Sequence, residues 1–192
     1  MSSLSFVVFR SLFAAALLAA GCAASAQSAA PALDIKTLRA GLAGEWQGKL
    51  EYRDYQADRW FGLPLRLTQE LVADGVTLIG KAEYDDGPKS GTVRITSVSM
   101  FVPATNIQYS SSFRAGRPAE LSSAVVRLVG AVDDTHWTMV EETIATDADR
   151  PAKLRETIVR DGARLTTLKE VDFLDDAGET WLTRNRTVLE KK

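Results

Sequence analysis

Histidine, cysteine and serine build most hydrolase and metal sites, and this chain of 192 residues uses them in no recognisable catalytic pattern. His136 is its single histidine, and Cys22, near the N-terminus, is its single cysteine. A zinc site usually needs several such ligands. Serines occur in runs at 110–112 and 122–123, but none lies in the Gly-x-Ser-x-Gly turn that exposes a nucleophile. We therefore expect no catalytic residue, no metal and no cofactor, and we place His136 at a strand edge.

Two adjacent carboxylates, Glu141 and Glu142, lie within a stretch that has strand character. Neighbouring side chains of a strand point to opposite faces, so only one of the two can point inward. Taking the face of His136 as the inner one assigns that role to Glu142. A buried carboxylate needs a partner, because an unpaired buried charge is costly. The candidate partners are Arg155, Arg184 and Arg186. The pair would serve either as a salt bridge in the wall or as a polar anchor for a ligand.

Trp60 and Phe61 are an aromatic pair in a connection that we predict over residues 55–64. This connection is longer than most others in the chain. An exposed Trp-Phe pair marks a contact with a ligand or a partner, and the same pair could instead fold down as a plug. Both interpretations stay open at this point.

The element that would position these side chains is a strand that starts at Trp46. Trp46, Gly48, Leu50 and Tyr52 alternate with charged or polar residues, which is the period of a half-buried strand. Apolar residues at helical spacing over 33–42 precede it, and glycines follow them. The sequence thus predicts a short helix leading into the first strand.

Short strands at regular intervals follow, over 63–71, 76–84, 92–102, 106–113, 121–131, 135–145, 154–160, 163–173 and 180–189. Asp74-Gly75 and Asp161-Gly162 are hairpin signals. Because the connections are short, neighbours in sequence should pair as an antiparallel, up-and-down meander. We predict an all-β fold, a closed barrel of about 8–10 strands with a short N-terminal helix, since closure removes the sheet edges. An open sandwich is the alternative.

A short helix followed by Gly44-x-Trp46 resembles the first signature of the lipocalin and calycin barrels. The resemblance implies that Trp46 closes one end of the barrel and that an arginine of the last strand, Arg184 or Arg186, packs across its indole. A Thr-Asp-Tyr motif, the second lipocalin signature, is not present. The chain is therefore similar to a looser, lipocalin-like relative.

The first 26 residues have the organisation of a secretory signal peptide. Arg10 precedes a small and apolar run over 12–20, and Ala24-Ser25-Ala26 fits the small-x-small cleavage rule. Cys22 offers an alternative, because Leu18 to Cys22 resembles a lipoprotein box in which Cys22 would be lipidated. We expect a signal peptide at 1–26, a flexible lead at 27–32 and a single barrel domain at 33–192. The protein would be periplasmic or secreted, or alternatively a membrane-anchored lipoprotein.

The charge balance excludes some partners. The whole chain has 23 basic and 25 acidic residues. Removing residues 1–26 leaves 22 basic against 25 acidic residues, a formal net charge of −3. This gives no basic surface for nucleic acid, and we expect no transmembrane segment. A chain with no cysteine after cleavage must be held together by its core.

These features predict an exported barrel that binds a small apolar ligand without catalysis. By alternation the cavity would be lined by Tyr52, Leu65, Leu67, Leu78 and Tyr84, with Trp60 and Phe61 at its mouth. Small inward positions, among them Gly80, Ala82 and Ser97, favour a hollow interior. The alternative is a filled barrel that acts as an envelope interaction or assembly module. An enzyme with a diffuse barrel site is the third hypothesis.

Overall fold

The structure is a computed structural model that describes residues 33–54 and 59–192. The strands are β1 (Gly44–Asp54), β2 (Arg59–Leu71), β3 (Thr77–Asp85), β4 (Thr92–Val102), β5 (Ile107–Arg114), β6 (Glu120–Asp133), β7 (His136–Asp147), β8 (Arg150–Asp161), β9 (Arg164–Phe173) and β10 (Leu182–Lys191). The helices are α1 (Ile35–Ala40) and α2 (Gly87–Ser90). The predicted signal peptide, the flexible lead and Cys22 lie outside the described residues.

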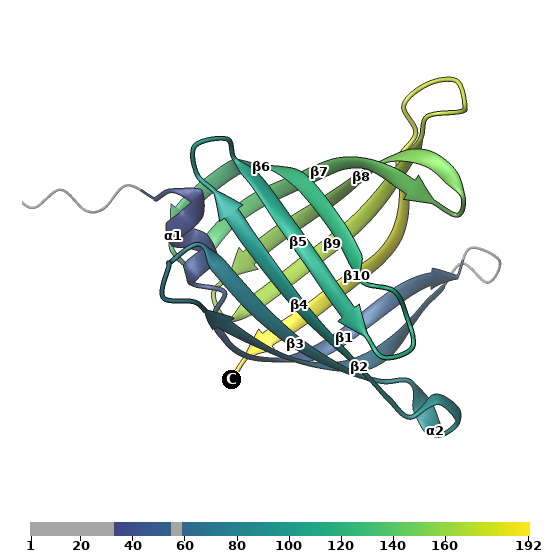
Figure 1. Ribbon diagram of the computed structural model, residues 1–192, viewed down its shortest axis with the longest axis horizontal. Helices are drawn as coiled ribbons and strands as arrows, with labels where there is room; N and C mark the ends of the chain where they lie inside the picture. The colour runs from purple at the N-terminus through teal and green to yellow at the C-terminus, as the bar shows by residue number, and fades with distance from the viewer. Residues whose placement is uncertain (1–32, 55–58) are drawn as a thin grey trace, which may run out of the picture. The chain divides into compact units, whose positions relative to one another are not determined.

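The ten strands form one closed antiparallel barrel in which every strand pairs with its neighbour in sequence (Figure 1). β1 and β10 close the ring, with Trp46 opposite Lys191 and Tyr52 opposite Asn185. The predicted all-β fold and up-and-down connectivity are confirmed. Closure leaves no unpaired edge in the sheet, which is the physical reason that a meander of this length curls on itself.

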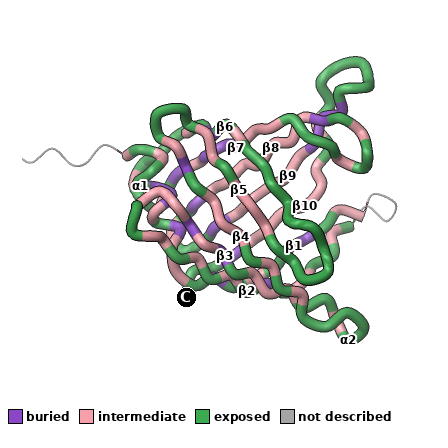
Figure 2. Tube along the Cα trace, viewed as in Figure 1, coloured by how far each residue is buried: buried purple, intermediate pink, exposed green. Residues whose placement is uncertain are grey.

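Helix α1 covers one end of the barrel, as Figure 1 shows. Its N-cap is Asp34, whose carboxylate accepts a hydrogen bond of 2.7 Å from the backbone N–H of Thr37. Leu38 is fully buried and belongs to a cluster with Trp46, Phe101 and other inward side chains. Burial is concentrated near this end, with a smaller group around Val171 (Figure 2). Among the described residues no helix is long and apolar enough to span a bilayer.

Trp46 lies beneath α1 and is almost completely buried. Its indole N–H donates to the carbonyl of Leu42 at 2.9 Å. The guanidinium of Arg160, in β8, lies 4.4 Å from the ring centroid, and the Lys191 ammonium lies 5.4 Å away. These contacts are cation–π interactions.

The expectation that Arg184 or Arg186 packs across Trp46 is corrected by this arrangement. β10 runs antiparallel to β1, so Arg186 is opposite Glu51, while Trp46 is opposite Lys191. Arg184 and Arg186 therefore lie toward the other end of the barrel. Arg160 instead packs across the indole of Trp46, because β8 carries it to the closed end of the barrel.

Candidate functional site

The end of the barrel opposite α1 holds a pocket of about 370 Å³. It opens beside α2, which Figure 1 places at the end away from α1. Its walls come mainly from inward side chains of β1 to β4, with Arg114 of β5 at the rim. The lining residues are Leu50, Tyr52, Phe61, Leu63, Tyr84, Asp86, Val93, Ile95 and Arg114. The pocket thus has apolar and aromatic walls with a few polar groups, a composition typical of small-molecule sites.

The aromatic side chains of this pocket come from three strands. Tyr52 and Phe61 face each other across β1 and β2, and their rings stack with centroids 5.5 Å apart. Tyr84 lies on β3 and is enclosed enough that burial, followed by the charges of Tyr52 and Glu156, raises the pKa of its hydroxyl. Tyr52, Phe61 and Tyr84 therefore lie where the sequence placed them, at the cavity.

Trp60 lies on the outer face, because β2 already begins at Arg59 and the expected long connection is partly strand. Arg53 and Arg186 stack on its ring at 5.7 and 4.5 Å. Arg186 also pairs with Glu51. Trp60 is thus packed among charged side chains on the outer surface. It neither plugs the barrel nor lines the mouth of the cavity.

Leu65, Leu67 and Leu78 point inward as expected, but toward the α1 end. Leu65 and Leu78 are each 4% exposed and belong to the packed cluster around Trp46, with Leu67 packed against it. They form the floor of the barrel, below the pocket. The barrel is therefore filled at one end and hollowed at the other.

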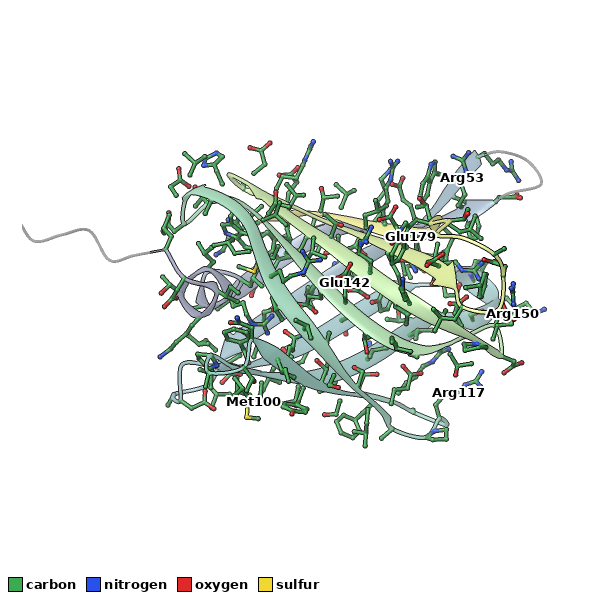
Figure 3. All side chains as sticks on the ribbon, turned by 90° about the horizontal axis from the view of Figure 1, so that it is seen from above. Arg53, Met100, Arg117, Glu142, Arg150 and Glu179 are labelled. Atoms are coloured by element: carbon green, nitrogen blue, oxygen red, sulfur yellow. The ribbon has the colours of Figure 1, made fainter. Side chains whose placement is uncertain are left out.

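Glu141, rather than Glu142, points into the barrel. It shares its face of β7 with the buried Trp137 and Met139. Glu142 lies on the outer wall, where it pairs with Arg127 at 2.7 Å and Arg155 at 2.8 Å. Figure 3 shows it on the same side of the barrel as Glu179. Arg155 is a partner of Glu142 as expected, but the pair lies on the outer face of the barrel and not on the inner one.

Glu141 lies in a polar cluster deep in the barrel. Its carboxylate accepts hydrogen bonds from Arg39 of α1 at 3.3 Å and from the amide of Gln108 at 2.9 Å. Arg39 also donates to Ser99. Burial raises the pKa of Glu141 to about 7, an effect that Arg39 and Gln108 oppose and the nearby Glu156 reinforces. A carboxyl group that exchanges its proton near neutral pH is thus present inside the barrel.

Glu156 is the second acid of this cluster and was not singled out from the sequence. It is the direct cross-strand partner of Glu141, and on its other side it is opposite Lys169. Burial raises the pKa of Glu156, and the charge of Lys169 opposes this. The signal that would have found it is its place between Leu154 and Ile158 in an inward-facing alternation.

The side of the mouth formed by β7 to β10 carries ion pairs. Arg184 pairs with Asp147, and its guanidinium lies 5.5 Å from the Phe173 ring centroid. Arg150 stacks on the same ring at 3.7 Å and binds Asp175. These contacts tie the ends of the strands together around Phe173, so Arg184 has a structural role at the mouth.

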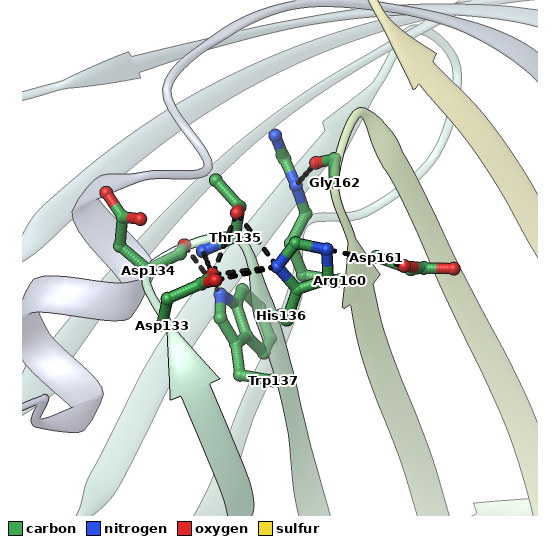
Figure 4. A network of polar contacts seen from close by, with 8 residues as sticks. All are labelled: Asp133, Asp134, Thr135, His136, Trp137, Arg160, Asp161 and Gly162. Atoms are coloured by element: carbon green, nitrogen blue, oxygen red, sulfur yellow. Dashed lines mark hydrogen bonds and ion pairs between the residues drawn. The ribbon is translucent and has the colours of Figure 1, made fainter.

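His136 is the first residue of β7, next to the turn from β6, and Figure 4 shows the polar contacts that it makes there. Its Nδ1 lies 2.9 Å from the Asp133 carboxylate, which also accepts from the hydroxyl of Thr135. These hydrogen bonds lower the pKa of Asp133 to about 2. Within residues 33–54 and 59–192 no three His, Cys, Asp or Glu side chains gather as metal ligands. The network closes the β6–β7 turn.

Comparison with proteins of known structure shows a similar barrel in Rv2717c from M. tuberculosis. The TM-score is 0.53 at 14% sequence identity, and the match covers 81% of this chain and 97% of that one. At this identity the likeness concerns the fold alone. No family model matches the chain, and no match was found among curated proteins. The chain is thus a ten-stranded antiparallel barrel with a structural neighbour of the same barrel kind.

Proposed function

We propose that this barrel binds a small molecule through its open end and performs no chemistry on it. The observation that carries the proposal is the pocket of about 370 Å³ lined by Tyr52, Phe61, Leu63 and Tyr84. Its apolar walls favour the apolar part of a ligand, with a gain of roughly 25 cal/mol per Å² of buried surface before the costs of association. The packed α1 end leaves this mouth as the entrance.

The test is a binding titration with N-phenyl-1-naphthylamine, an uncharged probe that fluoresces in apolar surroundings. Leu63→Trp places an indole in the pocket and should weaken binding by about tenfold or more, because the volume is occupied. The matched control is Ile144→Trp, which adds the same ring on the outer wall, where Ile144 is 73% exposed. Absence of binding to the unmodified protein, or equal loss in both variants, would contradict the proposal.

The same proposal includes that this chain is a relative of the lipocalins. It is supported by the order of a short helix, Gly44-x-Trp46 and a closed barrel, together with the cation–π contacts over Trp46. The missing second motif and the use of Arg160 point to a distant relative.

Export is proposed on the sequence of residues 1–26. Cleavage after Ala26 would give a periplasmic or secreted protein, and lipidation at Cys22 a membrane-anchored one. The intact mass of the protein purified from its own cells separates the two, because acyl chains on Cys22 add mass. An unprocessed N-terminus would overturn both.

An interaction module is the second candidate function, favoured by apolar side chains on the outer wall. Val125 and Ile144 are 48% and 73% exposed and line the same groove of the outer wall. Contiguous exposed apolar surface marks interaction sites. Sedimentation of the purified protein and of its envelope extract would reveal a stable complex, which charged substitutions at these positions should dissolve.

A further inference from the structure

We propose that the deep end of the barrel binds the protonated amino group of an amphipathic amine, held by Glu156 and the amide oxygen of Gln108. This inference rests on the proposed function, because the apolar part of the same ligand would occupy the pocket at the mouth. It refines the expectation of a small, largely apolar ligand to a ligand with one positively charged end.

The first observation is that acceptor groups in the cluster lack donors. Gln108 donates its amide N–H to Glu141, but its Oε1 is buried and has no hydrogen-bond partner among the described residues. Glu156 likewise accepts no hydrogen bond from any residue that the structure describes, although Lys169 interacts with it electrostatically. Unsatisfied buried acceptors are costly in a native protein and need an explanation. An ammonium group has three donors and no acceptor, which matches what is missing.

The second observation is that Glu156 lies close to Tyr84, a residue of the pocket wall. Part of the Glu156 side chain remains accessible although protein surrounds it. Tyr84 lines the mouth pocket, and its hydroxyl lies near enough to Glu156 for the two groups to interact electrostatically. A ligand whose apolar part lies between Tyr84, Phe61 and Tyr52 would therefore direct its end toward Glu156. Aromatic faces also attract cations.

Charged side chains of two neighbouring strands and of α1 lie in the same cluster as Glu156. Glu141 of β7 is its cross-strand neighbour, Lys169 of β9 lies on its other side, and Arg39 enters from α1. The two terminal nitrogens of Arg39 donate to Glu141 and Ser99, while its buried Nε has no hydrogen-bond partner among the described residues. Since burial keeps a proton on the two acids up to higher pH than usual, an incoming ammonium takes the place of that proton. The proton leaves to solvent, so the net charge of the cluster is unchanged by binding.

The experiment compares three probes that share a naphthyl ring: 1-naphthylmethylamine, 1-naphthylmethanol and 1-naphthylacetic acid. Isothermal titration calorimetry at pH 7 should show the amine bound about tenfold or more tighter than the alcohol, since hydrogen bonds to charged groups are the strong ones. Titration in two buffers of different ionisation enthalpy should show release of a fraction of a proton for the amine alone. Amine affinity should rise with pH as the carboxyl group of Glu156 loses its proton.

Glu156→Gln should remove the amine's advantage and the proton release while leaving the affinity for the alcohol unchanged. Glu142→Gln is the matched control, because the same change is made one strand away on the outer wall; it should leave all three affinities unchanged. If the alcohol binds and the amine binds no tighter, or if the acid binds tightest, the amine inference is overturned. The proposal that the pocket binds a small molecule would remain supported. If none of the three binds, the proposed function fails together with the amine inference.

Discussion

At the scale of single residues, the two interior acids differ in how the protein satisfies them. Glu141 is satisfied by Arg39 and Gln108, whereas Glu156 has only the more distant charge of Lys169. A carboxyl group in that position stabilises nothing by itself, because burial disfavours its charged form. A residue that costs stability and lies close to a pocket wall is a candidate for function.

Glu156→Gln should therefore stabilise the protein, and increasingly so at higher pH. The pKa of Glu156 is raised above its ordinary 4.5, so the folded state keeps a proton that the unfolded chain loses, and stability falls as pH rises from that value through the folded pKa. Thermal unfolding should give equal Tm values below pH 4.5 and a higher Tm of the variant above the folded pKa, where each 1 kcal/mol gained would raise the Tm by about 2–4 °C.

Glu142→Gln should change the pH dependence of stability in the opposite direction. Arg127 and Arg155 lower the pKa of Glu142, so its stabilising contribution is present above the ordinary 4.5 and is lost as pH falls through the folded pKa. The variant should have a lower Tm than the unmodified protein at pH 7, by a small amount because the pairs are partly exposed. A shared pH trend in the two variants would contradict the placement of these acids on opposite faces.

At the scale of elements, closure depends on how closely β1 approaches β10. Gly48 lies opposite Leu189, and a Cβ at Gly48 would lie 2.0 Å from the Val188 carbonyl oxygen. No side chain fits there unless one of the two strands moves. The glycine in the first strand thus permits the contact that turns a meander into a barrel.

Gly48→Ala should destabilise the protein by roughly 1–3 kcal/mol, the usual range for forced overpacking. Gly130→Ala is the control, since Gly130 also lies in a strand but a Cβ there would meet nothing within 4 Å. Urea unfolding of both variants measures the difference. Equal stability of the two variants would contradict the close contact between β1 and β10 at Gly48.

At the scale of the whole barrel, the two ends differ in kind. The α1 end is filled by Leu38, Trp46, Phe101 and their neighbours. The other end holds the pocket, and ion pairs such as Arg184–Asp147 hold its rim. In a barrel built in this way the packed core and the pocket are formed by different layers of side chains, so the proposed ligand would not have to disturb the core.

Hydrogen exchange should reveal this division. Backbone amides of β1 near Trp46 should exchange more slowly than those near Tyr52, because local opening needs less disruption where few apolar contacts are buried. A bound naphthyl probe should slow exchange near Tyr52 and Tyr84 and leave the α1 end unchanged. Uniform protection along the strands would contradict a filled and a hollow end.

The sequence by itself determined the class of the fold and its order of elements. The period-two alternation from Trp46 onward, the Asp74-Gly75 and Asp161-Gly162 turns and the short connections are local features, and they predicted an antiparallel barrel with one short helix before its first strand. Tyr52 and Tyr84 at a cavity also followed from alternation, and the resemblance to lipocalins implied Trp46 at the closed end. Local features suffice here because each strand pairs with its neighbour in sequence.

Only the tertiary structure decided which face of β7 is the inner one, which arginine covers Trp46 and which polar side chains meet. Alternation separates Glu141 from Glu142 but does not say which of two mixed faces is buried. Arg39, Gln108, Glu141 and Glu156 come from four elements and converge only because ring closure and register bring them together. Such a cluster has no signature along the chain, since its members are neighbours in space alone.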